Sequence, residues 1–190
     1  MKKFEKRMIL NYVLAVVVAG IISGITAVIP MYMAVPKIIY ANSVPTFLVG
    51  MTIGPVGGAI YAILISLVLN NIGIGSGTII YVLLFQIFEV IIIALIWHEK
   101  KWNLIRYSLT VIGATFLLKP FSYLLYYIFN KNLLGERNCI SYIKEMYGYY
   151  LQNSWRDTIL LYATGVLAAY VIMRGIDILT KKRKGEEKKV

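Results

Sequence analysis

The sequence has little of the side-chain chemistry that most enzymes use. It contains one cysteine and one histidine in 190 residues. The lone Cys139 excludes an internal disulfide framework, and no paired Cys and His spacing indicates a metal site. His98 belongs to no recognisable nucleophile and base pattern, and the GIGSG stretch at 73–77 lacks the lysine of a phosphate-binding loop. We therefore expect neither an enzyme nor a bound cofactor, and no ATP hydrolysis by this chain.

Acidic residues are also scarce. Nine Asp and Glu residues stand against 20 Lys and Arg, which gives a formal net charge of +11. In a soluble protein this excess would suggest nucleic acid as a partner. However, 59% of the residues are hydrophobic and the mean hydropathy is +0.71, values that are typical of membrane proteins. The expected partner is therefore a lipid bilayer and not nucleic acid.

Long polar stretches are few, which leaves no room for a separate soluble domain. We predict one integral membrane domain over residues 1–190, an all-α bundle of six membrane-spanning helices. Gly54 and Pro55 break the apolar run that starts at Ser43, because proline lacks a backbone donor and clashes with the preceding turn. The expected helices cover about 8–29, 43–53, 56–71, 78–97, 107–130 and 155–176, with a polar connection at 131–154 and a basic tail at 177–190.

Six spans would place both termini on one side of the membrane. Most Lys and Arg residues fall on that side, among them Lys100, Lys101, Arg106 and Arg174 and those of the two chain ends. Basic residues concentrate in the cytoplasmic loops of membrane proteins. We therefore predict cytoplasmic termini.

Glu89 and Lys119 are ionisable residues deep in predicted spans. At a rise of ~1.5 Å per residue, each lies ~16 Å from the outer end of its own helix, so the two can meet at one depth. An unpaired charge at mid-bilayer costs ~2.5 to 3.5 kcal/mol, and such residues usually pair or face a cavity. Two interpretations stay open: a structural ion pair, or the floor of a binding cavity that opens outward.

In the cavity interpretation, further residues would surround the deep charges. Gln86 lies one turn from Glu89, and Tyr123 and Tyr127 continue the face of Lys119 towards the outside. The rim would be formed by Asn71, Asn153, Trp155 and Arg156. Aromatic walls with a few polar groups suit a planar, water-soluble molecule of vitamin size.

Small residues recur every four positions along the first predicted helix, at Ala15, Ala19 and Ser23. Small residues at this spacing allow close helix contact in lipid. They are therefore candidates for binding a partner protein, and packing within the chain is the alternative.

Two stretches resemble motifs of a known family. Ala15 and Ala19 resemble an AxxxA motif, and the sequence at 44–64, VPTFLVGMTIGPVGGAIYAIL, resembles the turn P-x-x-L-x-G-x-x-x-G-P-x-x-G between a second and a third helix. Both motifs are features of the substrate-binding S-component of energy-coupling-factor (ECF) vitamin transporters. The six-helix architecture and the basic tail also resemble this family.

The resemblance implies high-affinity capture of a vitamin or related micronutrient at the outer face of a bacterial cytoplasmic membrane. It also implies two kinds of partner: a transmembrane T-component, which the AxxxA motif would contact, and two ATPase subunits. The family's binding elements correspond here to 32–40, 71–77, 147–156 and the region of Glu89 and Lys119. This correspondence adds Tyr40 to the candidate residues and indicates no one vitamin.

The Gly54-Pro55 hairpin also resembles the membrane input module of LytS-like histidine kinases, which makes a membrane-embedded small-molecule sensor the alternative. Against a sensor, the last predicted helix is followed by a charged stretch that ends in KKRKGEEKKV and contains no coiled-coil linker or output domain. A membrane enzyme or structural subunit is a third class. The single deep acid, Glu89, disfavours an enzyme.

Overall fold

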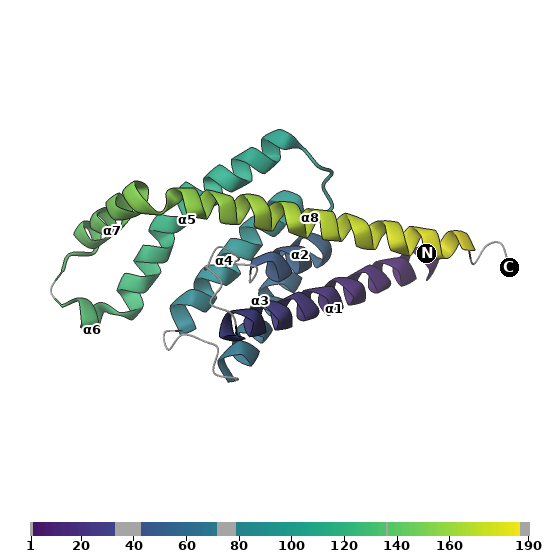
Figure 1. Cartoon of the computed structure of the whole chain (residues 1–190), viewed down its shortest axis with the longest axis horizontal. Coiled ribbons are helices and arrows are strands. Elements are labelled where there is room, and N and C mark those ends of the chain that lie inside the picture. Colours follow the sequence, from purple (N-terminus) through teal and green to yellow (C-terminus); the bar gives the residue numbers. More distant parts are fainter. Residues whose placement is uncertain (1, 33–42, 72–78, 136, 187–190) are drawn as a thin grey trace.

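The fold is all-helical throughout the described part of the chain. The computed structural model describes residues 2–32, 43–71, 79–135 and 137–186, and every regular element in these ranges is a helix (Figure 1). Four helices are long and apolar enough to cross a membrane: α1 (Lys2–Tyr32), α4 (Ile79–Trp97), α5 (Leu104–Phe129) and α8 (Trp155–Glu186). The predicted fold class is confirmed to this extent.

Two further apolar helices are shorter. Helix α2 (Ser43–Ile53) has 11 residues and α3 (Pro55–Asn71) has 17. At ~1.5 Å per residue they measure ~16 and ~26 Å, against ~30 Å for the hydrocarbon core of a bilayer. The six expected helices thus consist of four that are long enough to span and two that are shorter.

The predicted break between α2 and α3 falls at Gly54. Its φ of +106° lies in the left-handed region, where a side chain would be strained. Pro55 follows as the first residue of α3, the position at which the missing N–H of proline costs nothing. Glycine and proline therefore turn the chain here as expected.

Helix α2 forms the centre of the bundle. All residues from Pro45 to Met51 are buried, and α2 packs against α1, α3, α4 and α8. The approach to α3 is close: a Cβ added to Gly58 would lie 2.8 Å from the Gly50 Cα and 2.8 Å from Val90 Cγ2. Glycine at both positions lets the two backbones touch each other and α4.

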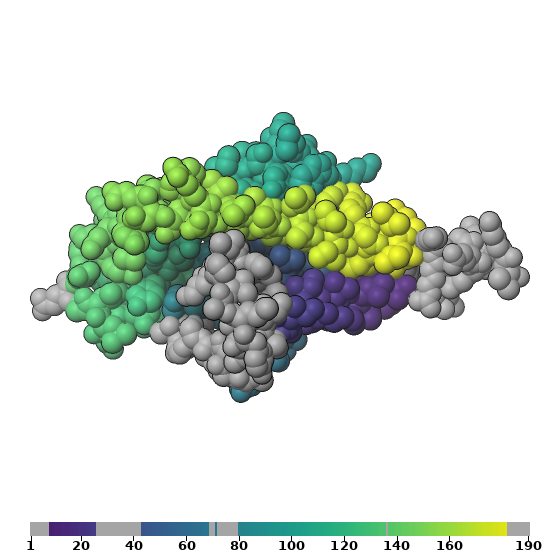
Figure 2. Space-filling model, viewed as in Figure 1, coloured from purple at the N-terminus to yellow at the C-terminus, as the bar shows by residue number. Residues whose placement is uncertain are grey.

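Helices α1 and α8 pack along each other towards the end of the molecule at which the chain begins and ends (Figures 1 and 2). There the Asn11 side-chain amide donates to Asp177 Oδ1 at 2.9 Å. Both helices are longer than the predicted 8–29 and 155–176, and α8 extends as a helix into the predicted tail. We call this the terminal end of the bundle.

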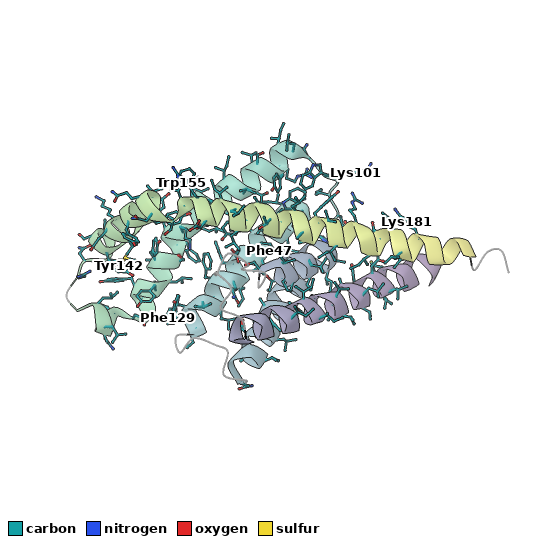
Figure 3. All side chains as sticks on the ribbon, viewed as in Figure 1. Phe47, Lys101, Phe129, Tyr142, Trp155 and Lys181 are labelled. Carbon is teal, nitrogen blue, oxygen red and sulfur yellow. The ribbon has the colours of Figure 1, made fainter. Side chains whose placement is uncertain are left out.

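The opposite end differs from the prediction. The expected polar connection at 131–154 folds into the short helix α6 (Lys131–Leu134) and the longer α7 (Cys139–Asn153). The Asn138 side chain caps α7 by accepting from the Ile140 N–H at 2.9 Å. Figure 3 shows Tyr142 on α7 and Phe129 near α6 at this end, far from the chain ends. We call it the distal end.

Large apolar side chains also lie on the outside of the bundle. Val56 on α3 is 72% exposed and Leu117 on α5 is 76% exposed, and α1 exposes Ile9, Val13, Val17 and Ile21 along one face. Extensive apolar exposure is unusual for a soluble monomer. It fits a bundle whose outer face contacts lipid.

Candidate functional site

Glu89 lies inside the bundle on α4. Its side chain is 5% exposed, and its Oε1 accepts a hydrogen bond from the hydroxyl of Tyr162 on α8. The Tyr162 ring stacks on Phe47 of the central helix α2, with ring centroids 6.4 Å apart (Phe47 is labelled in Figure 3). The deep acid is thus held between α4, α8 and α2.

Lys119 is half-buried on α5, and α7 supplies its partner. The Nζ atom lies 5.6 Å from the ring centroid of Tyr150, a cation–π contact. Burial raises the pKa of Tyr150 above its ordinary value, so the hydroxyl stays protonated. This hydroxyl donates to the Thr115 carbonyl oxygen at 3.0 Å. Within the described residues, Lys119 is thus partnered by an aromatic ring and not by an acid.

Pro120 explains why α7 docks at this level of α5. A proline inside a helix removes the hydrogen bond to the carbonyl four residues earlier, here that of Phe116. The Tyr147 hydroxyl donates to this Phe116 oxygen at 3.0 Å. The proline beside Lys119 therefore creates an acceptor on α5, and a tyrosine of α7 satisfies it.

Glu89 and Lys119 lie at neighbouring levels of α4 and α5. The rings of Phe88 and Phe121, which are close to them in sequence, lie 4.5 Å apart. Yet among the described residues the ion pairs within 4.0 Å do not include one between Glu89 and Lys119. The described geometry therefore does not support the interpretation that Glu89 and Lys119 form a direct structural ion pair.

Thr115, one helical turn before Lys119, adds an unsatisfied polar group. Its side chain is fully buried, and its Oγ1 has no hydrogen-bond partner among the described residues. Buried polar atoms are nearly always hydrogen-bonded, and an exception usually indicates strain, function or a missing small molecule. A buried hydroxyl, an ammonium and a carboxylate thus occur in one region of the bundle.

Tyrosines form a cluster at the distal end. Tyr81 of α4 meets Tyr126 of α5 edge to face at 5.1 Å, and Tyr142 of α7 lies 6.3 Å from Tyr126 and 5.8 Å from Tyr127. The Tyr127 hydroxyl donates to the Arg137 carbonyl oxygen at 2.7 Å. These rings connect α4, α5 and α7 above the two deep charges.

The residues of the predicted rim lie in two separate places, one at the start of α8 and one at the end of α3. Trp155 begins α8 and lies 6.2 Å from Phe116, with the Arg156 guanidinium 5.5 Å over its ring. Exposed Asn153 is next to it, and its amide donates to the Tyr149 carbonyl oxygen at 2.9 Å. Asn71 is exposed at the end of α3.

The remaining candidates are placed as follows. Gln86 accepts from the Ser66 hydroxyl at 3.0 Å and so connects α4 to α3. Tyr123 is half-buried on α5. Tyr40 lies outside the described residues. The structure thus brings Glu89, Lys119 and Tyr123 into one region of the bundle, and it places Gln86 in a contact between helices.

The small residues of α1 face the interior. Ala15 and Ala19 are fully buried, and Ser23 is 4% exposed and hydrogen-bonded to the Tyr61 hydroxyl of α3 at 3.1 Å. These side chains pack within the chain. The placement favours the intramolecular alternative over a surface kept for a partner.

The sequence prediction missed Tyr162 and Tyr150 as partners of the deep charges. Tyr150 falls within the stretch 147–156 that the resemblance implied. Tyr162 lies ~10 Å along α8 from Trp155, at a rise of ~1.5 Å per residue. The sequence carried no signal for Tyr162 as the donor to Glu89, because this contact depends on how the helices pack.

The described residues thus form an all-helical bundle in which four helices are able to cross a membrane, and Glu89 and Lys119 lie deep inside two of these helices. Comparisons with known protein families, with curated proteins and with solved structures found no match for this chain.

Proposed function

We propose that this protein captures a small water-soluble molecule of vitamin size in the half of the bundle nearest the distal end. The proposal rests on the contacts that the two deep ionisable residues make. Glu89 and Lys119 each contact a tyrosine and form no direct ion pair with each other among the described residues. Charged groups inside membrane helices are costly and commonly mark substrate pathways. A ligand that bridges them would complete their pairing.

The surrounding groups suit an aromatic or heterocyclic ligand with both polar and charged atoms. The rings of Tyr147 and Tyr150 stack on each other at 5.9 Å, and Tyr123 is half-buried on α5. The Thr115 hydroxyl, which has no partner among the described residues, adds a hydrogen-bonding group. Sites for small molecules combine mostly apolar walls with a few well-placed polar groups. Binding and release, without bond breaking, is the chemistry that these side chains support.

We further propose that the protein is a capture subunit of an ECF-type importer in a bacterial cytoplasmic membrane. It would deliver its ligand with a T-component and two ATPase subunits. The glycine-proline turn at Gly54 and the central position of α2 support this assignment. In this arrangement α2 and α3 form a hairpin within the membrane beside the four long helices.

The proposed orientation places the terminal end in the cytoplasm. Lys100, Lys101, Arg106 and Arg174 lie in or near the connection between α4 and α5 and the last third of α8, close to the chain ends. This distribution follows the positive-inside rule. The distal end with α7 then faces outward, where a scarce nutrient would be captured.

A binding assay tests the capture function. The purified chain in detergent is titrated with a panel of water-soluble vitamins, and we expect one compound to bind with nanomolar to micromolar affinity. Lys119→Met and Glu89→Gln should each weaken that binding at least about tenfold, because a charge pairing worth about 1.4 kcal/mol or more is lost. Lys144→Met, which neutralises an exposed lysine of α7, is the matched control.

Unfolding midpoints of all variants separate binding defects from folding defects. If Lys119→Met and Glu89→Gln fold like the unaltered protein and bind the same compound equally well, the deep charges do not form the site.

A further inference from the structure

A second region with ligand-binding features lies at the terminal end, away from the proposed capture site. A pocket of about 350 Å³ opens there between the start of α1, the end of α2, the connection between α4 and α5, and α8. Met8, Met51 and Met173 supply its apolar part. Its polar lining includes Lys100, Lys101 and Arg174.

Arg174 is held in place beside this pocket. Its Nε donates to the Tyr170 hydroxyl at 2.8 Å, and its guanidinium lies 5.2 Å over the Tyr170 ring. Its Nη1 lies 3.6 Å from Asp177 Oδ2. A guanidinium carries five N–H donors, so these contacts leave donors for a further oxygen ligand.

The lining also contains an amide and two acidic groups. Asn11 lines the pocket and donates to Asp177, and its Oδ1 is buried, without a hydrogen-bond partner among the described residues. Glu99 and Asp177 line the pocket as well, so its described lining has three cationic and two anionic side chains, a formal excess of one positive charge. A ligand with one negative charge would balance this excess.

The pocket lies at the level where the apolar segments end. The apolar stretch of α1 begins at Met8, that of α4 ends at Trp97 and that of α5 begins at Leu104. Pocket residues Met8 and Lys100 are therefore at or next to these boundaries. Lipid headgroups occupy this level of a bilayer, and basic pockets between helix ends bind anionic headgroups.

We propose that this pocket binds the headgroup of an anionic phospholipid with one negative charge. The phosphodiester lies against Arg174, Lys100 and Lys101, and the three methionines contact the glycerol backbone and upper acyl atoms. Phosphatidylglycerol has this chemistry. The site is independent of the proposed capture function, because no residue is shared between the two.

Lipid retention in native mass spectrometry tests the proposal. The full chain is reconstituted with phosphatidylglycerol, phosphatidylmethanol, phosphatidylethanolamine or phosphatidylcholine, and the bound lipid is counted. We expect phosphatidylglycerol and phosphatidylmethanol, which both carry one negative charge, to be retained more than the two zwitterionic lipids. Equal retention of phosphatidylglycerol and either zwitterionic lipid would overturn the proposal.

Charge variants locate the site. Lys100 and Lys101 are both exposed, so Lys100→Gln with Lys101→Gln should leave the fold intact. Retention of phosphatidylglycerol should fall about fivefold per lysine neutralised. The control neutralises Lys131 and Lys144, two exposed lysines at the distal end, and should change retention little. An equal loss in both double variants would show unspecific charge attraction and refute the pocket.

A soluble phosphate compound tests the source of the headgroup. Millimolar glycerol phosphate should not displace the lipid. If it does, the pocket binds a soluble phosphate compound and the lipid assignment is wrong.

Discussion

Replacing Tyr147 by phenylalanine tests how Pro120 and α7 build the candidate site. The Tyr147 hydroxyl donates to the Phe116 carbonyl oxygen, which Pro120 leaves without a helical donor. Loss of the hydroxyl leaves this acceptor unsatisfied in the half-buried contact between α5 and α7. The expected cost is about 1 to 3 kcal/mol of unfolding free energy, the penalty for an unpaired buried polar group.

The same substitution should cost much less when Pro120 is replaced by alanine. Residue 120 then has an N–H that donates to the Phe116 oxygen within the helix, so Tyr147 is no longer needed there. We expect Tyr147→Phe to cost less than about 0.5 kcal/mol in the Pro120→Ala background, which gives a coupling energy of about 0.5 kcal/mol or more. Reversible unfolding in mixed detergent micelles measures all four proteins of the cycle.

Tyr149→Phe is the matched control, because Tyr149 lies on the same helix and is 62% exposed. It should change the unfolding free energy by less than about 0.5 kcal/mol. An equal cost of Tyr147→Phe with and without Pro120 would refute the reasoning.

Three further predictions concern the bundle and the distal end. Gly58→Ala should destabilise the protein by about 1 to 3 kcal/mol, because the added Cβ would lie 2.8 Å from the α2 backbone. Gly113→Ala is the control: its Cβ would meet nothing within 4 Å, so this change should be neutral or stabilising. Equal effects on thermal unfolding would contradict the close approach of α2 and α3. Ala19→Trp should lower the unfolding midpoint because Ala19 is fully buried, whereas Val16→Trp on the exposed face of α1 should not. If the Ala19→Trp protein is stable and has lost only uptake, Ala19 faces a partner protein instead. Ligand binding should quench the intrinsic fluorescence of the protein through Trp155. If the Trp155→Phe protein shows the same decrease in fluorescence on binding, the ligand lies elsewhere.

Local chemistry made some elements predictable from the sequence. Gly54 and Pro55 fix a turn by their own backbone properties, so the predicted bounds of 43–53 match α2. The depth of Glu89 and Lys119 followed from helical rise alone, and the structure places them at neighbouring levels. All-helical architecture followed from the length of the apolar segments.

Tertiary contacts were harder to predict. Helix α7 was expected as a polar connection, because its apolar face carries mainly tyrosines and depends on an acceptor that Pro120 frees on another helix. The small side chains of Ala15 and Ala19 indicate a close helix contact but do not show which helix is the partner. Tyr162 resembles any other tyrosine in sequence, and only the tertiary fold, in which α8 packs against α2 and α5, brings its hydroxyl to Glu89.

The most direct test of the capture function is native mass spectrometry of the gently purified chain, followed by identification of any small molecule that it releases. We predict a vitamin-like compound in a one-to-one ratio, present with the unaltered protein and the Lys144→Met control and depleted in Lys119→Met. A protein that carries no such compound, and that also binds no member of the vitamin panel at up to micromolar concentrations, would contradict the proposed function.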